Sequence, residues 1–249
     1  MIICHSRKFI FVHLHKCAGT SLTDALKPFL SLDDLVICGG QDATKTSRTS
    51  ESLPTALRKH STALQISEAV GKETWNSYFK FGFVRHPLDR LVSLYEFFNR
   101  VHRNNTTPPG IAKRRILFSR KKPRTKYPDQ WPWNWAGMQA FLTTNDFSGF
   151  IRSDHLAKAQ GAMPQVRSLT GRSENLLVDF VGKVENIVDD WRKVCVQLGI
   201  PQERLSHTNQ SERQHDDFRS YWKKEDLDFV LEKYAADFEV FSYSTDVDL

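Results

Sequence analysis

Six consecutive residues, Lys16 to Ser21, combine the chemical groups that bind a phosphate or a sulfate. They read Lys-Cys-Ala-Gly-Thr-Ser, with one glycine, one lysine and two neighbouring hydroxyls. In a tight turn before a helix, backbone N–H groups point at one spot, and the helix N-terminus adds partial positive charge. We interpret the segment as an anion-binding loop with contacts from Lys16, Ala18, Gly19, Thr20 and Ser21. The alternative is an ordinary turn with a solvent-exposed lysine.

The order of these residues differs from the phosphate-binding loop of kinases and GTPases. That loop reads GxxxxGK[ST], with the lysine after the glycines and a hydroxyl on Mg²⁺. Here Lys16 precedes Gly19, and no clear apolar strand ends in a metal-binding aspartate, although Asp179 comes closest. A P-loop kinase or phosphotransferase is therefore the rival enzyme class, disfavoured by the misplaced lysine.

A second group of anion-binding residues lies farther along the chain, in FGFVRHPLDRLVS. Arg85 follows an apolar run, and Ser93 comes about two helical turns later. Arginine binds phosphate through two parallel hydrogen bonds, and a nearby serine adds a donor. The alternative is an exposed arginine with a serine on a helix surface.

The elements around these residues alternate between strands and helices. The sequence predicts strands at 9–14, 78–84 and 178–181. It predicts helices that start near 21 and at Pro87, together with helices over 67–75, 191–198 and 224–236. Open α/β sheets bind ligands at the carboxyl ends of their strands, where Arg85 would lie. We therefore expect one α/β domain over 1–249, in which a central parallel sheet is flanked by helices in three layers with a P-loop-like opening unit.

The composition indicates which binding partners and which cellular compartment to expect. The formal net charge of +6 favours anionic partners such as nucleotides, nucleic acid, acidic polysaccharide or anionic lipid. No apolar run approaches the roughly 20 residues of a membrane span, and the first residues lack the order of a signal peptide. The four cysteines are scattered without a CxxC pair, which favours a reducing compartment; we expect the cytoplasm.

The segment 101–135 is polar, basic and rich in tryptophan, and we expect an inserted loop or lid there. Its basic runs are 113–115 and 120–126, followed by Trp131, Trp133 and Trp135. Such a lid could attract an anionic acceptor and stack sugar rings on the indoles. The alternative is a solvated charged surface with tryptophans that anchor the loop. A basic nucleic-acid-binding module is the non-enzymatic rival.

The two anion-binding motifs together resemble those of a known family. HLHKCAGTSL is similar to the 5′-phosphosulfate loop of sulfotransferases, and FGFVRHPLDRLVSLY to their 3′-phosphate motif. The closest resemblance is to the family that contains the Golgi carbohydrate sulfotransferases and their bacterial relatives. Three later blocks, VDFVGKVENIVDDW, SHTNQSER and YAADFEVFSYS, also resemble that family. The likeness is weakest between Asn99 and Trp135.

The resemblance implies an activity and a donor. The chain would transfer a sulfuryl group from 3′-phosphoadenosine-5′-phosphosulfate (PAPS) to a hydroxyl, on a carbohydrate acceptor, and release adenosine 3′,5′-bisphosphate. The loop residues Lys16, Gly19, Thr20 and Ser21 would hold the 5′-phosphosulfate, and Arg85 with Ser93 the 3′-phosphate. No metal would be required. The spacing of His13, His15 and Cys17 also matches no usual zinc pattern.

The resemblance also suggests the base that accepts the hydroxyl proton. A histidine has a suitable pKa near neutrality, and His60 lies in the stretch where the family has its catalytic histidine. Lys16 would be the second catalytic residue. His155 is the rival base, and Glu96 is a more distant one.

Three positions depart from the pattern of that family. His15 stands where proline is common, Cys17 where threonine is common, and His86 where Asn or Asp usually precedes the proline. Histidine is a poor helix cap, so the third departure raises the question of how the backbone next to Arg85 is held.

Overall fold

The computed structural model describes residues 1–37, 57–106, 133–202, 205 and 217–247. The chain divides into two compact units. One comprises Met1–His86, Pro164–Gln210 and Ala236–Tyr243, and the other Pro87–Met163, Ser211–Ala235 and Ser244–Leu249.

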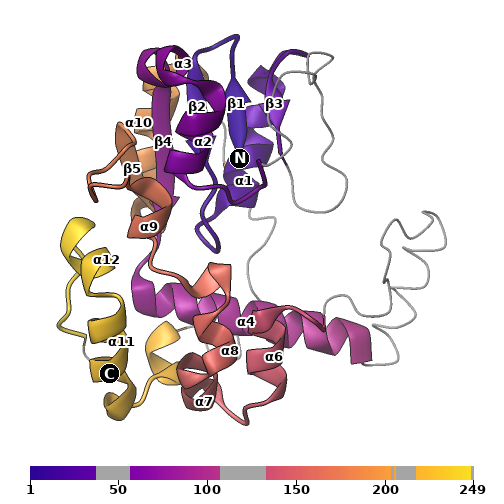
Figure 1. The fold of residues 1–249 in the computed structure, drawn as a ribbon, viewed down its shortest axis with the longest axis vertical. Coiled ribbons are helices and arrows are strands. Elements are labelled where there is room, and N and C mark those ends of the chain that lie inside the picture. The colour runs from indigo at the N-terminus through magenta and orange to yellow at the C-terminus, as the bar shows by residue number, and fades with distance from the viewer. Residues whose placement is uncertain (38–56, 107–132, 203–204, 206–216, 248–249) are drawn as a thin grey trace. The chain divides into compact units, whose positions relative to one another are not determined.

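The first unit contains a five-stranded sheet with the order β3-β1-β2-β4-β5 (Figure 1). β2 pairs in parallel with β4, and β4 with β5, whereas β1 pairs antiparallel with β2 and β3. The strands are β1 (Ile2–Cys4), β2 (Phe9–Val12), β3 (Leu35–Val36), β4 (Phe79–Val84) and β5 (Phe180–Lys183). The predicted α/β class is confirmed, but only the β2-β4-β5 part of the sheet is parallel.

Helices cover both faces of this sheet because neighbouring strand residues point to opposite sides. Phe9, Phe11 and Phe81 pack on one side with α1 and α10, and Ile10, Val12 and Val84 on the other with α2, α3 and α9. The helices of the unit are α1 (Gly19–Leu26), α2 (Ala63–Val70), α3 (Lys72–Ser77), α9 (Val166–Leu169), α10 (Ile187–Leu198) and α12 (Ala235–Val240), with short 3₁₀ helices η1 (Lys27–Phe29) and η3 (Val184–Asn186).

Several predicted boundaries differ from the observed ones for local reasons. The helix expected over 67–75 is two helices, because Gly71 has a φ of 82° and interrupts the helical path. α2 also begins earlier, at a capping box between Thr62 and Gln65. The last predicted helix is likewise divided, into α11 and α12, at Tyr234.

The second unit is helical and is built around the long helix α4. Tyr95 in α4 contacts three phenylalanine rings, with centroids 5.3 Å from Phe141, 5.4 Å from Phe147 and 5.2 Å from Phe150. Its elements are α4 (Pro87–Thr106), α6 (Ala136–Leu142), α7 (Phe147–Arg152), α8 (Asp154–Ala157), η2 (Gln160–Ala162), η4 (Phe218–Tyr221) and α11 (Lys224–Lys233).

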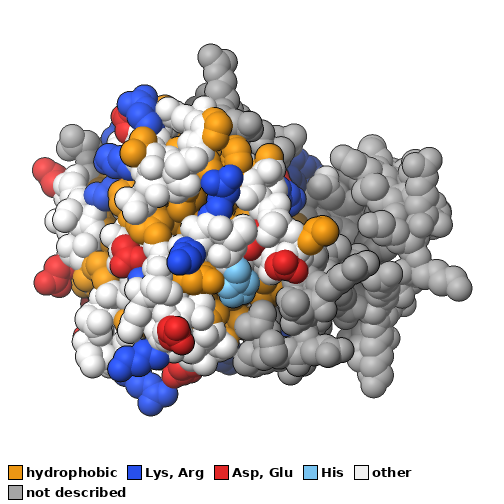
Figure 2. Space-filling model, turned by 90° about the horizontal axis from the view of Figure 1, so that it is seen from above, with side chains coloured by type: hydrophobic (Ala, Val, Ile, Leu, Met, Phe, Trp, Pro, Cys, Tyr) orange, Lys and Arg blue, Asp and Glu red, His pale blue; other side chains and the backbone are white. Residues whose placement is uncertain are grey.

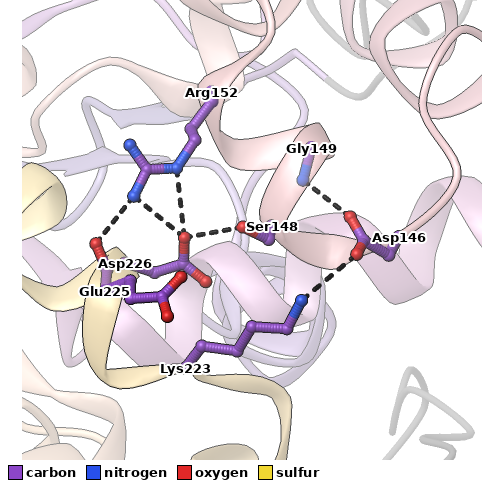
Figure 3. Close-up of polar contacts among 7 residues, drawn as sticks. All are labelled: Asp146, Ser148, Gly149, Arg152, Lys223, Glu225 and Asp226. Atoms are coloured by element: carbon purple, nitrogen blue, oxygen red, sulfur yellow. Dashed lines mark hydrogen bonds and ion pairs between the residues drawn. The ribbon is translucent and has the colours of Figure 1, made fainter.

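Polar contacts tie α7 to the start of α11 within this unit (Figure 3). The buried Asp226 carboxylate accepts hydrogen bonds from Ser148 Oγ at 2.7 Å and Arg152 Nε at 3.1 Å. Asp146 caps α7 by accepting from the Gly149 amide at 2.8 Å. The Asp146 bond satisfies one N–H group at the start of α7, and the Asp226 bonds join the side chains of α7 to α11.

The expected insertion at 101–135 is partly corrected. Residues 101–106 continue α4 and are helical. The basic runs and Trp131 lie outside the described residues. Trp135 lies parallel to the Phe97 ring, with an interplanar angle of 11° and a centroid distance of 6.4 Å, so this tryptophan contacts the helical unit.

Among the helices that the structure describes, none combines the length and the apolar character needed to cross a membrane.

A buried carboxylate holds the turn between β1 and β2 against the segment before β3. Asp34 accepts hydrogen bonds from the His5 amide at 2.6 Å, from Ser6 Oγ at 2.6 Å and from the Ser31 amide at 2.8 Å. Its side chain is fully buried. Burial alone would raise the pKa of the carboxyl, but the hydrogen bonds from Ser6 and Ser31 hold it well below its usual value.

We expect Asp34→Asn to lower the free energy of unfolding at pH 7 by about 2–4 kcal/mol, because an amide NH₂ would face backbone donors. A depressed folded-state pKa stabilises the fold above the unfolded pKa of about 3.9, and this contribution is lost as pH falls below that value. The gap between wild type and variant should therefore shrink between pH 7 and pH 3 in urea unfolding. Asp33→Asn, at an exposed neighbour, is the control; an equal effect there would contradict the assignment.

Candidate functional site

The loop between β2 and α1 has the backbone conformation expected of an anion-binding turn. Lys16 and Ala18 have φ values of 64° and 55°, whereas Cys17 between them does not have a positive φ. Alternation of this kind turns successive N–H groups toward one concave face. α1 begins at Gly19, so its N-terminus faces the same turn. Left-handed non-glycine residues cost about 1–3 kcal/mol each, and such strain is concentrated at functional sites.

Glycine is required at position 19 because the His13 ring lies too close for a Cβ atom, and not because of its φ. A Cβ built on this residue would lie 2.2 Å from the ring of His13. His13 is itself buried at the end of β2. Glycine therefore allows the first turn of α1 to pack against the imidazole, with Thr20 and Ser21 in that turn partly exposed.

The parallel sheet brings Arg85 to this loop. β2 and β4 pair with Val12 opposite Gly82, so Arg85 and the loop extend from the same edge of the sheet. The Arg85 guanidinium donates to the Lys16 carbonyl, with Nη1 and O 3.4 Å apart. The Arg85 guanidinium thus lies beside the turn that carries Lys16, a residue 69 positions away in the sequence.

His60 lies against the same loop. The N-terminal amino group of Met1 donates to the carbonyl of Lys59 at 3.2 Å and so holds the segment before α2. His60 Nδ1 donates to the His13 carbonyl at 2.8 Å. Its ring stacks on His15, with centroids 3.5 Å apart and an interplanar angle of 21°. Donation through Nδ1 leaves Nε2 as the basic nitrogen of the neutral ring.

Burial lowers the pKa of two of these imidazoles, those of His13 and His60. Burial, followed by the charge of His15, lowers the pKa of His60 to about 3. Burial also lowers the pKa of His13 well below its ordinary value. The pKa of His60 is therefore well below the near-neutral value expected from its residue type, and in the chain alone its ring is unprotonated at neutral pH.

The other predicted site residues belong to the helical unit. Ser93 lies in α4 with its side chain buried. Glu96 is buried and accepts hydrogen bonds from Tyr221 at 2.7 Å and Asn99 at 3.0 Å. His155 is exposed in α8. Among the three candidate bases, His60 is the one in the same unit as the loop.

The structure also brings together three side chains that the sequence analysis did not single out. Gln165 accepts from the Arg85 amide at 2.9 Å and donates to the Arg85 carbonyl at 2.8 Å. Asp237 in α12 accepts from the Gln165 amide at 2.8 Å. Glu185 accepts from the His86 amide at 2.6 Å and so fixes the main chain of the residue that precedes α4.

The sequence carried unequal signals for these three residues. Glu185 and Asp237 lie in the blocks VDFVGKVENIVDDW and YAADFEVFSYS, whose resemblance to the sulfotransferases was visible. Gln165 lies outside every such block, and a single glutamine after Pro164 carries no pattern of its own.

No cluster of three or more His, Cys, Asp or Glu side chains suited to a metal ion occurs among the described residues. A separate hollow of 580 Å³ lies at the opposite ends of β2 and β4, where Lys8, Phe79 and Lys80 are among its lining residues. Lys80 there is paired with Asp179 at 2.9 Å and donates to two carbonyls, so its charge is already compensated.

Comparison with known proteins assigns the chain to a family. An uncharacterized protein of Archaeoglobus fulgidus is 24% identical over 141 residues, which cover 57% of this chain and 84% of that protein. No solved structure gives a significant match. The model of the sulfotransferase family matches residues 1–244, essentially the whole chain. The chain therefore belongs to the sulfotransferase family.

Proposed function

We propose that this protein transfers a sulfuryl group from PAPS to a hydroxyl of a carbohydrate acceptor, with Lys16 and His60 as its catalytic residues. Membership of the family supports sulfuryl transfer in general. The observation that carries the rest is the edge of the sheet where the strained loop, Arg85 and His60 meet.

The arrangement of the loop supports binding of the 5′-phosphosulfate. The turn with positive φ at Lys16 and Ala18, and the helix N-terminus at Gly19, offer N–H donors and partial positive charge to an anion. Thr20 and Ser21 would add hydroxyl donors. This β2–loop–α1 unit also supports our expectation of a P-loop-like opening unit.

Arg85 would bind the 3′-phosphate, since a guanidinium forms two parallel hydrogen bonds to phosphate. Its position beside the Lys16 carbonyl supports a single nucleotide that spans both motifs. Ser93 would add a donor, an assignment that depends on the resemblance of its motif.

The transfer itself is a substitution at sulfur. The acceptor oxygen attacks the sulfur atom, and the bond from sulfur to the oxygen that bridges it to phosphorus breaks. The Lys16 ammonium would offset the negative charge that develops on this bridging oxygen. His60 Nε2 would take the acceptor proton. The products are a sulfate ester and adenosine 3′,5′-bisphosphate, and no metal is required to balance the charge.

The acceptor class and the cellular compartment are inferred from the family resemblance, the basic runs and the cysteines. The resemblance to carbohydrate sulfotransferases favours a sugar hydroxyl, and the basic runs between 113 and 126 favour an anionic one. The described cysteines Cys4, Cys17 and Cys195 are buried thiols, which supports the cytoplasm. Incubation with ³⁵S-labelled PAPS and a panel of neutral and anionic polysaccharides, glycolipids and small alcohols tests the acceptor class directly.

Neither rival function gains support. The family match gives none to a P-loop kinase. On the face seen in Figure 2, the Lys and Arg side chains of the described residues are interspersed with acidic and hydrophobic ones. The basic runs on which a nucleic-acid-binding module would depend lie outside the described residues.

We expect adenosine 3′,5′-bisphosphate to bind about 10- to 150-fold more tightly than AMP, because AMP lacks the 3′-phosphate that Arg85 would contact. Arg85→Ala should remove most of this preference. Isothermal titration calorimetry with both ligands measures it. Arg7→Ala is the control, since this arginine contacts the Phe29 carbonyl. Equal affinities in the wild type would show that the second motif has been misread.

Lys16→Ala should lower kcat by about 10²–10³, because it removes the positive charge that would offset the negative charge on the bridging oxygen. Lys8→Ala is a matched control: Lys8 has a φ of 52° and lies in the turn at the other end of β2. The two substitutions alter similar backbone positions, so an equal loss of kcat in both would point to a backbone effect and against the proposed role.

His60→Ala should lower kcat by about 10²–10⁴ and leave the affinity for the bisphosphate nearly unchanged. A base must be unprotonated, and the pKa of His60 is about 3. Titration of this ring in the free enzyme should therefore not reduce kcat/KM between pH 8 and pH 5. Steady-state kinetics over that range test both statements. Normal turnover in His60→Ala with an inactive His155→Ala would assign the base to His155.

A further inference from the structure

The backbone next to Arg85 is held by a side chain that has no part in the proposed chemistry. Gln165 is buried, and its carboxamide contacts both polar groups of the Arg85 main chain. Its Oε1 accepts from the Arg85 amide at 2.9 Å, and its Nε2 donates to the Arg85 carbonyl at 2.8 Å. The side chain thus pairs with Arg85 as a neighbouring strand would, just past the end of β4.

The same carboxamide reaches the anion-binding loop. The buried Cys17 thiol donates to Gln165 Oε1 at 3.1 Å. Cys17 lies between the two left-handed residues of the loop. One oxygen atom therefore accepts from both motifs, which lie far apart in sequence.

Gln165 is in turn fixed by a buried carboxylate. Asp237 is completely buried and accepts from the amides of Gln165 and Val166, each at 2.8 Å. Its Oδ2 also accepts from Gln165 Nε2 at 3.3 Å. This contact orients the carboxamide, because a carboxylate must face the NH₂ group and so turns Oε1 toward Arg85 and Cys17.

We infer that Gln165 is a positioning residue, which sets the place of Arg85 relative to the loop and so the preference for a nucleotide with phosphates at both ends. This inference rests on the proposed function. Gln165 acts on the backbone of Arg85, whereas the guanidinium contacts the 3′-phosphate. The role is distinct from that of Glu185, which accepts from the amide of the next residue, His86.

The inference predicts a selective loss. Gln165→Met keeps the length of the side chain but removes all its hydrogen bonds. The ratio of the AMP dissociation constant to that of adenosine 3′,5′-bisphosphate should fall about 10-fold, the worth of one misplaced charge-assisted hydrogen bond. Binding of AMP should change little, because a thiol is a weak donor and the loop loses only that bond. A residue that merely stabilises the fold would lower the melting temperature and leave this ratio unchanged.

Two further variants make the test decisive. Gln139→Met is the matched control, because Gln139 in α6 also donates its carboxamide to a main-chain carbonyl, that of Trp133. It should keep the wild-type ratio. Gln165→Asn retains a polar group in the buried site but is one methylene too short to contact both groups of Arg85. Its ratio of dissociation constants should fall as that of Gln165→Met does. It replaces Gln165→Met in the test if the methionine variant does not fold.

Calorimetry with the two nucleotides on all four proteins distinguishes the outcomes. A ratio that falls in both Gln165 variants and is kept in Gln139→Met supports the inference. A wild type that prefers the bisphosphate, together with a folded Gln165 variant that keeps the full preference, would overturn the inference alone. A wild type without any preference would overturn the proposed function and the inference with it.

Discussion

The parallel pairing of β2, β4 and β5 is the constraint on which the rest of the candidate site depends. Val12 pairs with Gly82, and Val84 with Lys183, so the residues that follow these strands emerge along one edge. The loop from Lys16 to Ser21, Arg85 and Glu185 each begin within four residues after one of these strand ends. A slip of one residue in the pairing would turn each side chain to the opposite face of its strand. His13 would then leave the helix that it packs against.

Charge is divided at this edge between groups that stay charged and groups that stay neutral. Under the proposed function, Lys16 and Arg85 supply the positive charge that binds the anion, and neither needs an imidazole to do so. His13 and His60 are kept neutral by burial, and His60 also by the charge of His15 beside it. Under the proposed function, this division allows the same edge to bind phosphates and to accept a proton.

The main chain just before α4 is held by side chains that lie far away in the sequence. Helix α4 starts at Pro87, after a histidine that caps helices poorly. Glu185 accepts from the His86 amide, and Gln165 contacts the Arg85 main chain. Each belongs to an element far from Arg85 in sequence. The backbone that presents the guanidinium is therefore held by tertiary contacts and not by its own local sequence.

Local patterns in the sequence predicted the three parallel strands, several of the helices and the order of the motifs. The aromatic and β-branched runs before Lys16 and Arg85 predicted the two central strands. The helix predicted over 191–198 matches most of α10, which ends before Gly199 with its φ of 61°. The spacing of Lys16, Gly19 and Thr20 predicted the turn after the first strand. These features depend on backbone preferences that act over a few residues, so a single sequence is sufficient to find them.

Tertiary structure alone decided the contacts between these elements. β1 was not predicted, because Ile2–Cys4 is too short to show a pattern, and its antiparallel pairing makes the sheet mixed. The stack of His60 on His15 and its low pKa depend on burial, which residue type does not reveal. No sequence pattern pointed to Gln165. Its role depends on the fold, which positions its carboxamide between Arg85, Cys17 and Asp237.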